Sequence, residues 1–306
     1  MKAEIVIHRP DKEKLMAVIK AAAWDSWWIL DTETDGLDVI GHKAKHKAYY
    51  IGLMPLDSRH VFIITRDEFE EWGMREVINE LCLIGHNLRF DLHALDLNPR
   101  YMWRDTMLAA YFGHTTGKRS MDHIAKMHGW PKIPTPDALK CGLIHEIPPK
   151  ELFAYLADDC LITARMYKVL QTRRDGVQGD YALDRIVYKM ERRGMRLLPD
   201  RLQEVSAELD TKITNNEASL RHCGMKGNLN SSAQVGEWLI ENGRKLPRTP
   251  TGKPSTSKIV LQSLADSGDK LAQMLIDWRK TMKLRTSFIE PLPKLAQDNI
   301  LYPRTN

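Results

Sequence analysis

The feature that most constrains this chain is an apolar run that ends abruptly in acids, in the stretch WWILDTETDGLD at residues 27–38. The aromatic and aliphatic residues predict a short buried strand. Four acids occupy the last eight residues of the stretch: Asp31, Glu33, Asp35 and Asp38. Like charges this close need a cation, a proton or solvent between them. Asp31 and Glu33 lie two apart, so a strand directs both to one face. The pair suits Mg²⁺ or Mn²⁺, although the stretch by itself favours a solvated strand end.

Length and composition place the chain among ordinary globular proteins, because 306 residues with 43% hydrophobic and 28% charged residues suffice for one large domain or two ordinary ones. No apolar run approaches the roughly 20 residues that span a bilayer, and a charge comes too early for a signal peptide. We therefore expect a cytoplasmic protein with no membrane partner. The cysteines form no C-x-x-C pair, which argues against a zinc ribbon or a disulfide framework: Cys82, Cys141, Cys160 and Cys223.

The excess of basic over acidic residues lies in the C-terminal part of the chain. The net charge is +5, and residues 179–306 carry 21 Lys and Arg against 15 Asp and Glu. A basic segment combined with an acidic pocket predicts that one part holds a polyanion and the other holds metal. Chance scatter of charge is the alternative that charge alone leaves open.

Hydrophobic periodicity predicts a mixed α/β domain over residues 1–178 and a mainly helical region over residues 179–306. In the helical region, Pro199 and Gly224 mark the ends of a helix, and residues 242–258 predict an exposed basic loop. The elements expected in the first part are strands at 26–33, 48–56, 60–65 and 82–87 and helices at 66–82 and 148–174.

Two later segments contribute further polar residues at expected element ends. GHNLRFDL places Asn87, Phe90 and Asp91 just after a short strand, where a helix begins. YLADDCLIT places Tyr155 and Asp159 one turn apart on a long helix, so they share a face. Taken singly, Asp91 is equally explained as a first-turn acid that complements the helix dipole, and Tyr155 as an aromatic at the edge of the core.

Together and in this order, the patterns D-x-E, N-x-x-F-D and Y-x-x-x-D resemble the three exonuclease motifs of the DEDD superfamily, in its tyrosine subgroup. The resemblance implies an α/β ribonuclease-H-like fold with a mixed sheet and 3′→5′ exonuclease activity. The implied reaction is hydrolysis of the 3′-terminal phosphodiester of a DNA strand, which releases a nucleoside monophosphate.

The chain also resembles family A DNA polymerases over nearly its whole length. DTMLAAYF and SMDHIAKMHG are similar to the stretches after the second motif, and YKMERRGMRL, NLNSSAQVGEWLIENG and LIDWRKTMKLRTSFIEPL to the connecting helix and thumb. ILYPRTN is similar to the entry into the palm, so we expect no polymerase active site in this chain. The resemblance leaves three alternatives in a bacterial or phage-infected cell: a fragment of a polymerase, a subunit whose palm and fingers form a separate chain, or a free nuclease.

The resemblance also implies roles for five catalytic residues. Asp31, Glu33 and Asp159 hold the nucleophile-side ion of a two-metal site of Mg²⁺ or Mn²⁺. Asp31 bridges to the second ion, and Asp91 reaches that ion through water. Tyr155 orients the attacking water, since a phenol with a pKa of about 10 is a poor general base at neutral pH.

The implied substrate is single-stranded DNA or a frayed primer 3′ end, held by phosphate contacts and base stacking without sequence readout. Leu37 and Asn87 match strand-contacting positions. The alternative for Leu37 is a core leucine, whereas Asn87 can contact the strand, cap the helix that begins at residue 88, or do both. Lys118 and Arg119 match a strand-contacting loop, with solvated surface charge as the alternative. A thumb-like loop that follows the duplex backbone contributes Arg244, Lys245, Arg248, Lys253 and Lys258.

Several neighbouring residues are predicted to lie outside the site. Asp158 is expected to be mostly a solvated acid, and Asp35 and Asp38 to be turn residues. His42 and His46 fit a basic surface segment better than a metal pair. Two other functions remain open on the sequence: an RNA-trimming exonuclease of the ribonuclease D kind, and a non-catalytic DNA-binding subunit of a polymerase.

Overall fold

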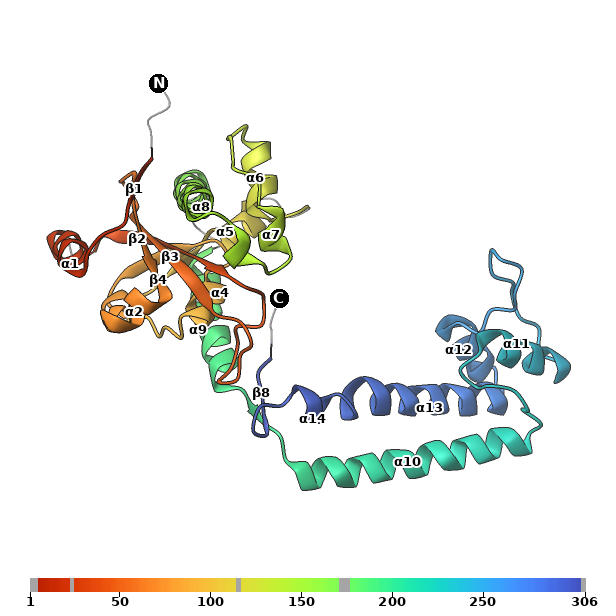
Figure 1. Ribbon diagram of the computed structural model, residues 1–306. Helices are drawn as coiled ribbons and strands as arrows, with labels where there is room; N and C mark the ends of the chain where they lie inside the picture. Colours follow the sequence, from red (N-terminus) through yellow and green to blue (C-terminus); the bar gives the residue numbers. More distant parts are fainter. Residues whose placement is uncertain (1–4, 23–24, 114–116, 171–176, 304–306) are drawn as a thin grey trace. The chain divides into compact units, whose positions relative to one another are not determined.

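The computed structural model describes residues 5–22, 25–113, 117–170 and 177–303 (Figure 1). Its contacts divide the chain into two compact units. Unit 1 comprises Met1–Gly194 with Tyr302–Asn306, and unit 2 comprises Met195–Leu301. Each unit has its own hydrophobic core and is described by itself.

Unit 1 is built on a mixed six-stranded sheet with the strand order β1-β4-β3-β2-β5-β6. β3 is antiparallel to both β2 and β4, whereas the pairs β2–β5, β5–β6 and β1–β4 are parallel. This arrangement confirms the predicted α/β ribonuclease-H-like class. The strands are β1 (Val6–His8), β2 (Trp27–Thr34), β3 (Ala48–Pro55), β4 (His60–Thr65), β5 (Cys82–Gly85) and β6 (Arg104–Asp105).

Helices cover both faces of this sheet, as Figure 1 shows. They are α1 (Lys12–Ala21), α2 (Arg66–Glu71), α3 (Met74–Asn79), α4 (Leu88–Ala94), α5 (Thr106–Gly113), α6 (Met121–Met127), α7 (Asp137–Lys140), the short η1 (Ile144–Glu146), α8 (Pro149–Leu170) and α9 (Val177–Arg193). The single helix expected over 66–82 is wrong, because Gly73 adopts a left-handed φ of 67° that ends α2 and begins α3. The helix expected over 148–174 is confirmed as α8 to Leu170, and its last residues lie outside the described ones.

The alternation of side chains along β2 determines where the site lies. Trp28 and Leu30 are buried on the face packed by α1, α2, α3 and α4. Ile29 points to the other face, where it joins a buried cluster with Leu156 and Cys160 of α8. Since successive strand side chains point to opposite faces, Asp31 and Glu33 continue the face of Ile29 toward α8.

A glycine on β3 lets α8 approach the sheet closely. Gly52 pairs with Asp31 in the β2–β3 register. A Cβ at Gly52 would lie 3.0 Å from Cys160 Sγ and 3.1 Å from Leu156 Cγ. Such distances are tighter than ordinary van der Waals contact, so a larger residue here would push α8 away from the strand that carries the acids.

α9 is fastened to unit 1 by buried ion pairs. Arg89 of α4 lies 2.8 Å from both Asp184 and Glu191 of α9, and His93 Nε2 lies 3.0 Å from Glu191. Trp103 Nε1 donates to Asp184 at 3.0 Å. Unit 1 thus extends beyond residue 178, and the domain boundary expected there stays a prediction.

Unit 2 is mainly helical, as predicted, around a core that includes Leu220, Trp238, Leu275 and Trp278. Its elements are β7 (Met195–Arg196), α10 (Pro199–His222), α11 (Ser232–Glu241), α12 (Lys258–Asp266), α13 (Lys270–Leu284), the π-helical η3 (Arg285–Ile289), α14 (Leu292–Leu295) and β8 (Ile300–Leu301). The helix expected to begin at Pro199 and to end before Gly224 is confirmed as α10.

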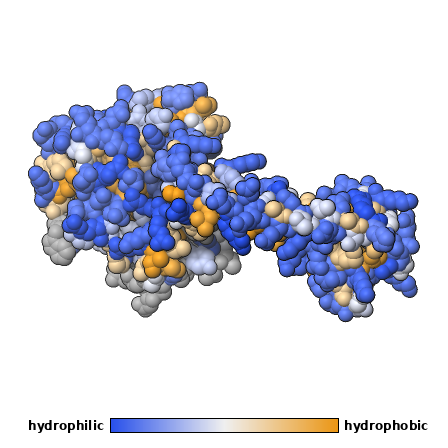
Figure 2. Space-filling model, turned by 90° about the horizontal axis from the view of Figure 1, so that it is seen from below, coloured by the Kyte–Doolittle hydropathy of each residue, from blue (hydrophilic) through white to orange (hydrophobic). Residues whose placement is uncertain are grey.

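The surface facing the viewer in Figure 2 is largely hydrophilic, with hydrophobic residues in separate patches. Within the described residues, no helix combines the length and the apolar character needed to cross a membrane.

The close approach of α8 predicts an effect of Gly52→Ala. We expect this variant to lower the free energy of unfolding by about 1–3 kcal/mol, because α8 must shift to admit the methyl group. Gly179→Ala on α9 is the matched control, since its Cβ would meet nothing within 4 Å. The control should change stability by less than about 1 kcal/mol. Urea denaturation measures both, and equal stability of the two variants would contradict the expectation.

Candidate metal centre

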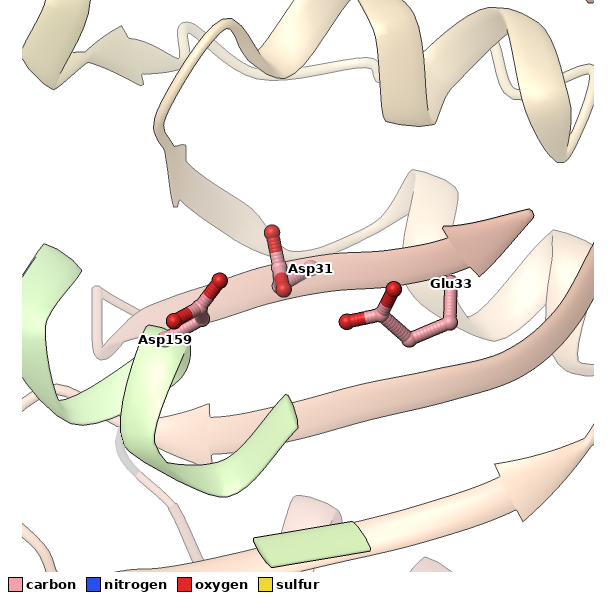
Figure 3. Close-up of side chains that lie close together, drawn as sticks. All are labelled: Asp31, Glu33 and Asp159. Atoms are coloured by element: carbon pink, nitrogen blue, oxygen red, sulfur yellow. The ribbon is translucent and has the colours of Figure 1, made fainter. Parts of the chain in front are cut away.

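Three carboxylates converge where α8 crosses the sheet, as Figure 3 shows. Asp31 and Glu33 come from β2 and Asp159 from the middle of α8. One carboxylate oxygen from each lies within 4.8 Å of the others. Glu33 and Asp159 are only 6% and 7% exposed, and Asp31 is half-buried. These three residues are called the acid cluster below.

Asp91 stands beside the acid cluster rather than in it. Asp91 lies on α4, is 3% exposed, and accepts a hydrogen bond from Thr32 Oγ1 at 2.7 Å. Thr32 lies between the two β2 acids and points to the opposite face of that strand. The Asp91 charge is nevertheless close enough to contribute to raising the pKa of Asp31.

The buried carboxylate of Asp105 positions the helix that carries Asp91. Asp105 Oδ1 accepts the backbone N–H of Asn87 at 3.0 Å, and Oδ2 accepts that of Leu88 at 2.8 Å. Oδ1 also accepts the N–H of Met107 at 2.8 Å. One side chain therefore satisfies free N–H groups at the starts of both α4 and α5.

Lys132 is the cation that lies against the acid cluster. Its Nζ lies 2.8 Å from Asp159 Oδ1 and 3.1 Å from Asp122 Oδ1. The lysine side chain is 7% exposed, and its Nζ lies 4.7 Å from the centre of the Tyr155 ring. A buried ammonium beside these carboxylates partly offsets their mutual repulsion.

Tyr155 and Asp158 are both held by the segment that follows Lys132. Tyr155 is 6% exposed, and its hydroxyl lies 3.1 Å from Thr135 Oγ1. Asp158 Oδ2 accepts the backbone N–H of Ile133 at 2.7 Å. Asp158 is 8% exposed, so its description as a mostly solvated acid is wrong. A hydrogen bond to a distant backbone group accounts for its burial.

Burial and the repulsion of neighbouring carboxylates raise the pKa of the three acids of the acid cluster and of Asp91. Burial is the largest cause for Asp31 and Glu33, followed by the neighbouring carboxylates. Burial raises the pKa of Asp159 to about 6 against the opposing charge of Lys132. Burial raises the pKa of Asp91 to about 8, although the Thr32 hydrogen bond acts in the opposite direction. Without metal, Asp91 therefore keeps its proton at neutral pH, and Asp31 and Glu33 hold protons more tightly than free carboxyl groups do.

The donor set of the acid cluster fits a hard divalent cation. All of its donors are carboxylate oxygens from one face of β2 and one face of α8. Mg²⁺ and Mn²⁺ prefer such oxygen ligands, and Mg²⁺ retains several waters when few carboxylates are offered. The acid cluster therefore could hold a metal ion, with Asp91 as an adjoining carboxylate.

Two of the residues expected to contact a DNA strand are exposed, Leu37 after the end of β2 and Asn87 at the start of α4. Leu37 is 75% exposed, which excludes the alternative of a core leucine. Asn87 is exposed at the N-cap of α4 with a left-handed φ of 62° and ψ of 44°. Its side chain makes no capping hydrogen bond, so the alternative of a side-chain cap is wrong.

Lys118 and Arg119 follow α5 in unit 1. Lys118 is exposed. The Arg119 guanidinium lies 4.2 Å from the centre of the Tyr111 ring, and Tyr111 is 46% exposed. Arg119 therefore presents a stacked, planar cation rather than a freely solvated charge.

The basic loop of unit 2 is exposed as predicted and contains a small hairpin. Arg248 pairs with Pro254 across the hairpin, and Arg248 Nη1 donates to Gly252 O at 2.6 Å. Arg244 differs from the others because its Nε donates to Asp269 Oδ2 at 2.7 Å. The remaining predicted contacts of this loop are exposed: Lys245, Arg248, Lys253 and Lys258.

Asp35 lies in the turn after β2, as expected, and makes local contacts. It accepts the backbone N–H of Lys47 at 3.1 Å, and its Oδ1 lies 3.3 Å from His46 Nδ1. Asp38 is half-buried in the same turn region, and its carbonyl accepts the N–H of His46 at 3.0 Å. His42 Nδ1 lies 2.9 Å from the hydroxyl of Tyr302.

Sequence reasoning missed Lys132, Asp105 and Thr32. An acid before a helix is a recognisable N-cap signal, so Asp105 could have been assigned to the start of α5 but not to α4. Thr32 is the middle residue of the D-x-E motif, and its role as hydrogen-bond donor to Asp91 becomes visible only in the structure. Lys132 could not be assigned to the site from the sequence, because Asp159, the acid that it contacts there, lies 27 residues further along the chain.

Family models match both parts of the chain. The model described as 3′-5′ exonuclease matches residues 10–174, and the model described as DNA polymerase family A matches residues 199–305. The two matches follow one another along the chain in the order that the motifs indicated.

Similar proteins are longer polymerases. The chain is 26% identical to DNA polymerase I of Borreliella burgdorferi over 92% of this chain and 33% of that protein. It is 24% identical to DNA polymerase DpoZ of Acinetobacter phage SH-Ab 15497 over 85% of this chain and 47% of that protein. The chain thus spans less than half the length of these curated relatives.

A solved structure shares the fold. It is the POL domain of Pol1 from M. smegmatis, in complex with a DNA primer-template and dNTP. The TM-score is 0.66 at 16% sequence identity, and the match covers 97% of this chain and 51% of that chain.

The raised pKa of Asp91 predicts a pH-dependent stability of the metal-free protein. The folded state holds this proton up to pH of about 8, whereas the unfolded chain releases it near pH 4. The contribution of Asp91 to the free energy of unfolding therefore falls as pH rises between these values. Asp91→Asn does not titrate and keeps an acceptor for Thr32. In EDTA, its melting temperature should exceed that of the parent by a margin that grows from pH 5 to pH 8.

Thermal denaturation followed by circular dichroism measures this margin. Asp137→Asn is the control, because Asp137 is an exposed acid that is paired with Lys140 at the surface. Its melting temperature should follow that of the parent across the same pH range. A margin for Asp91→Asn that stays constant or shrinks with pH would contradict the assignment.

Proposed function

Because the chain belongs to the 3′-5′ exonuclease family, we propose that it removes nucleotides from the 3′ end of DNA. A portion of the DNA polymerase family A region follows the exonuclease domain, and we propose that the chain works together with a polymerase. The reaction is hydrolysis of the terminal phosphodiester with release of a nucleoside monophosphate. The observation that carries the proposal is the convergence of Asp31, Glu33 and Asp159 within 4.8 Å on one face of the sheet.

The acid cluster is the metal-binding part of the proposed mechanism. Two bound Mg²⁺ or Mn²⁺ ions would supply activation of water and stabilisation of the leaving oxygen. Asp31, Glu33 and Asp159 would hold the ion on the nucleophile side, with Asp31 shared between the ions. Asp91 would reach the second ion through water. This role is consistent with its position outside the acid cluster and with its hydrogen bond from Thr32.

Tyr155 is proposed to orient the attacking water. Burial and the neighbouring Asp159 raise the pKa of Tyr155 well above its ordinary value. The phenol therefore stays protonated at neutral pH and offers a hydrogen bond rather than accepting a proton as a base. Thr135 fixes the hydroxyl position through the 3.1 Å contact. Asp159 and Tyr155 thus present a ligand and a water-orienting group from adjacent turns of one helix.

The proposed substrate is a single strand or a frayed primer end. Leu37, exposed at 75%, offers an apolar surface for the terminal base, and the exposed Asn87 offers an amide to the strand. Lys118 and Arg119 offer charge to phosphates. None of these contacts reads base identity, so digestion should not depend strongly on sequence.

A role for unit 2 follows from its exposed cations. Lys245, Arg248, Lys253 and Lys258 are proposed to contact the phosphate backbone of a duplex, in a manner that weakens with salt. Arg244 is proposed to position this loop through Asp269, and it reaches DNA only if that ion pair opens. Palm and fingers would come from the rest of a longer polymerase or from a separate chain.

Asp31→Asn tests the proposed function. The full chain should digest a 5′-labelled single-stranded DNA oligonucleotide from the 3′ end with Mg²⁺ or Mn²⁺, and digestion should stop in EDTA. Asp31→Asn should lower the rate at least about 100-fold, because a shared metal ligand loses its charge. Denaturing gel electrophoresis of the products over time measures the rate.

Asp35→Asn is the matched control, because Asp35 lies four residues away and contacts Lys47 and His46 instead of the acid cluster. Its rate should stay within about threefold of the parent rate. Equal digestion by Asp31→Asn and the parent would sink the site assignment. An RNA oligonucleotide of the same sequence separates the alternatives: preference for RNA favours trimming of the ribonuclease D kind, and no digestion of either favours a non-catalytic subunit.

A further inference from the structure

Lys132 bridges two carboxylates of very different exposure. Its Nζ lies 2.8 Å from Asp159 Oδ1, in the acid cluster, and 3.1 Å from Asp122 Oδ1, on α6. The Asp159 side chain is 10% exposed and that of Asp122 is 63% exposed. The ammonium of Lys132 is therefore already paired with Asp122, and this pair could remain if Asp159 bound a metal ion instead of the lysine.

The backbone around Lys132 is fixed to α8, so the mobility of this residue is confined to its side chain. Ile133 N–H donates to Asp158 Oδ2 at 2.7 Å, and Thr135 contacts the Tyr155 hydroxyl at 3.1 Å. Pro131 and Pro134 flank this contact and restrict φ at both positions. A lysine stem with four rotatable carbons on such a rigid base can exchange partners without backbone movement.

A divalent cation on Asp159 competes directly with the lysine. Nζ lies 2.8 Å from Asp159 Oδ1, so a metal ion bound to that oxygen would stand close to the ammonium, and the two cations would repel. Moving the ammonium fully to Asp122 avoids leaving a buried charge unpaired, which is otherwise costly.

We propose that Lys132 is an exchangeable internal cation: it holds Asp159 in the metal-free site and passes to Asp122 when a divalent ion binds the acid cluster. This inference rests on the proposed function, because it requires the acid cluster to bind metal. Lys132 acts here as a positioning residue. It keeps the Asp159 carboxylate oriented before loading, and it lowers metal affinity by competing for the same oxygen.

Opposite shifts in metal affinity test the exchange. In the full chain without DNA, Lys132→Met should bind Mn²⁺ about tenfold more tightly, because the competing charge is gone while the apolar stem remains. Asp122→Asn should bind Mn²⁺ about threefold more weakly, because the displaced ammonium loses its second partner. Isothermal titration calorimetry and the electron paramagnetic resonance signal of free Mn²⁺ measure both constants.

A double variant separates exchange from a general effect of charge. If Asp122 acts through Lys132, Asp122→Asn should change Mn²⁺ affinity less than about twofold in the Lys132→Met background. Lys140→Met is the control, since Lys140 forms an exposed ion pair with Asp137 away from the acid cluster. Its affinity should match that of the parent.

A purely structural role of Lys132 would weaken binding in both single variants. Unchanged or weaker Mn²⁺ binding by Lys132→Met therefore overturns the exchange. Melting in EDTA reports whether each variant is folded. If Lys132→Met does not fold, unchanged Mn²⁺ affinity in the exposed Asp122→Asn variant still overturns the proposal.

The parent chain separates this inference from the proposed function. A parent that neither binds Mn²⁺ nor digests DNA overturns the proposed function. A parent that does both, with variants that fail to shift in opposite directions, overturns only the exchange by Lys132.

Discussion

The packing of α8 against β2 forces three carboxylates together, and the rest of unit 1 accommodates their repulsion. Apolar contact does the forcing: Ile29 of β2 meets Leu156 and Cys160 of α8 in a fully buried cluster. Gly52 leaves room for this approach. Burial of hydrocarbon on the same face is favourable enough to carry Asp31, Glu33 and Asp159 into a position that their charges disfavour.

Polar side chains around the acid cluster reduce this conflict without removing it. Lys132 supplies a positive charge to Asp159, and Thr32 supplies a hydrogen bond to Asp91. Asp105 secures the start of α4 through backbone N–H groups. The acids nevertheless retain raised pKa values, so a divalent ion that entered the site would displace protons, and its binding would be coupled to stability.

How far sequence could predict the fold differs between local and distant features. β2, the β3–β4 hairpin, α8 and α10 follow from hydrophobic periodicity and end signals, and their positions agree with expectation. The prediction of a single helix over 66–82 was wrong because the spacing of apolar residues continues on both sides of Gly73, whereas the backbone ends one helix and begins another at this glycine. Asp158 was misjudged because its partner, the N–H of Ile133, belongs to a segment with no recognisable periodicity.

By itself, the sequence determined which polar side chains of one strand or helix share a face. Residues two apart on a strand, or four apart on a helix, point to the same side. Asp31 could therefore be paired with Glu33, and Tyr155 with Asp159, from the sequence alone. Only the tertiary structure decided that Asp91 rests on Thr32 and that Lys132 lies against Asp159. Those contacts join segments far apart in the chain, and spacing along a sequence carries no information about where folding brings such segments together.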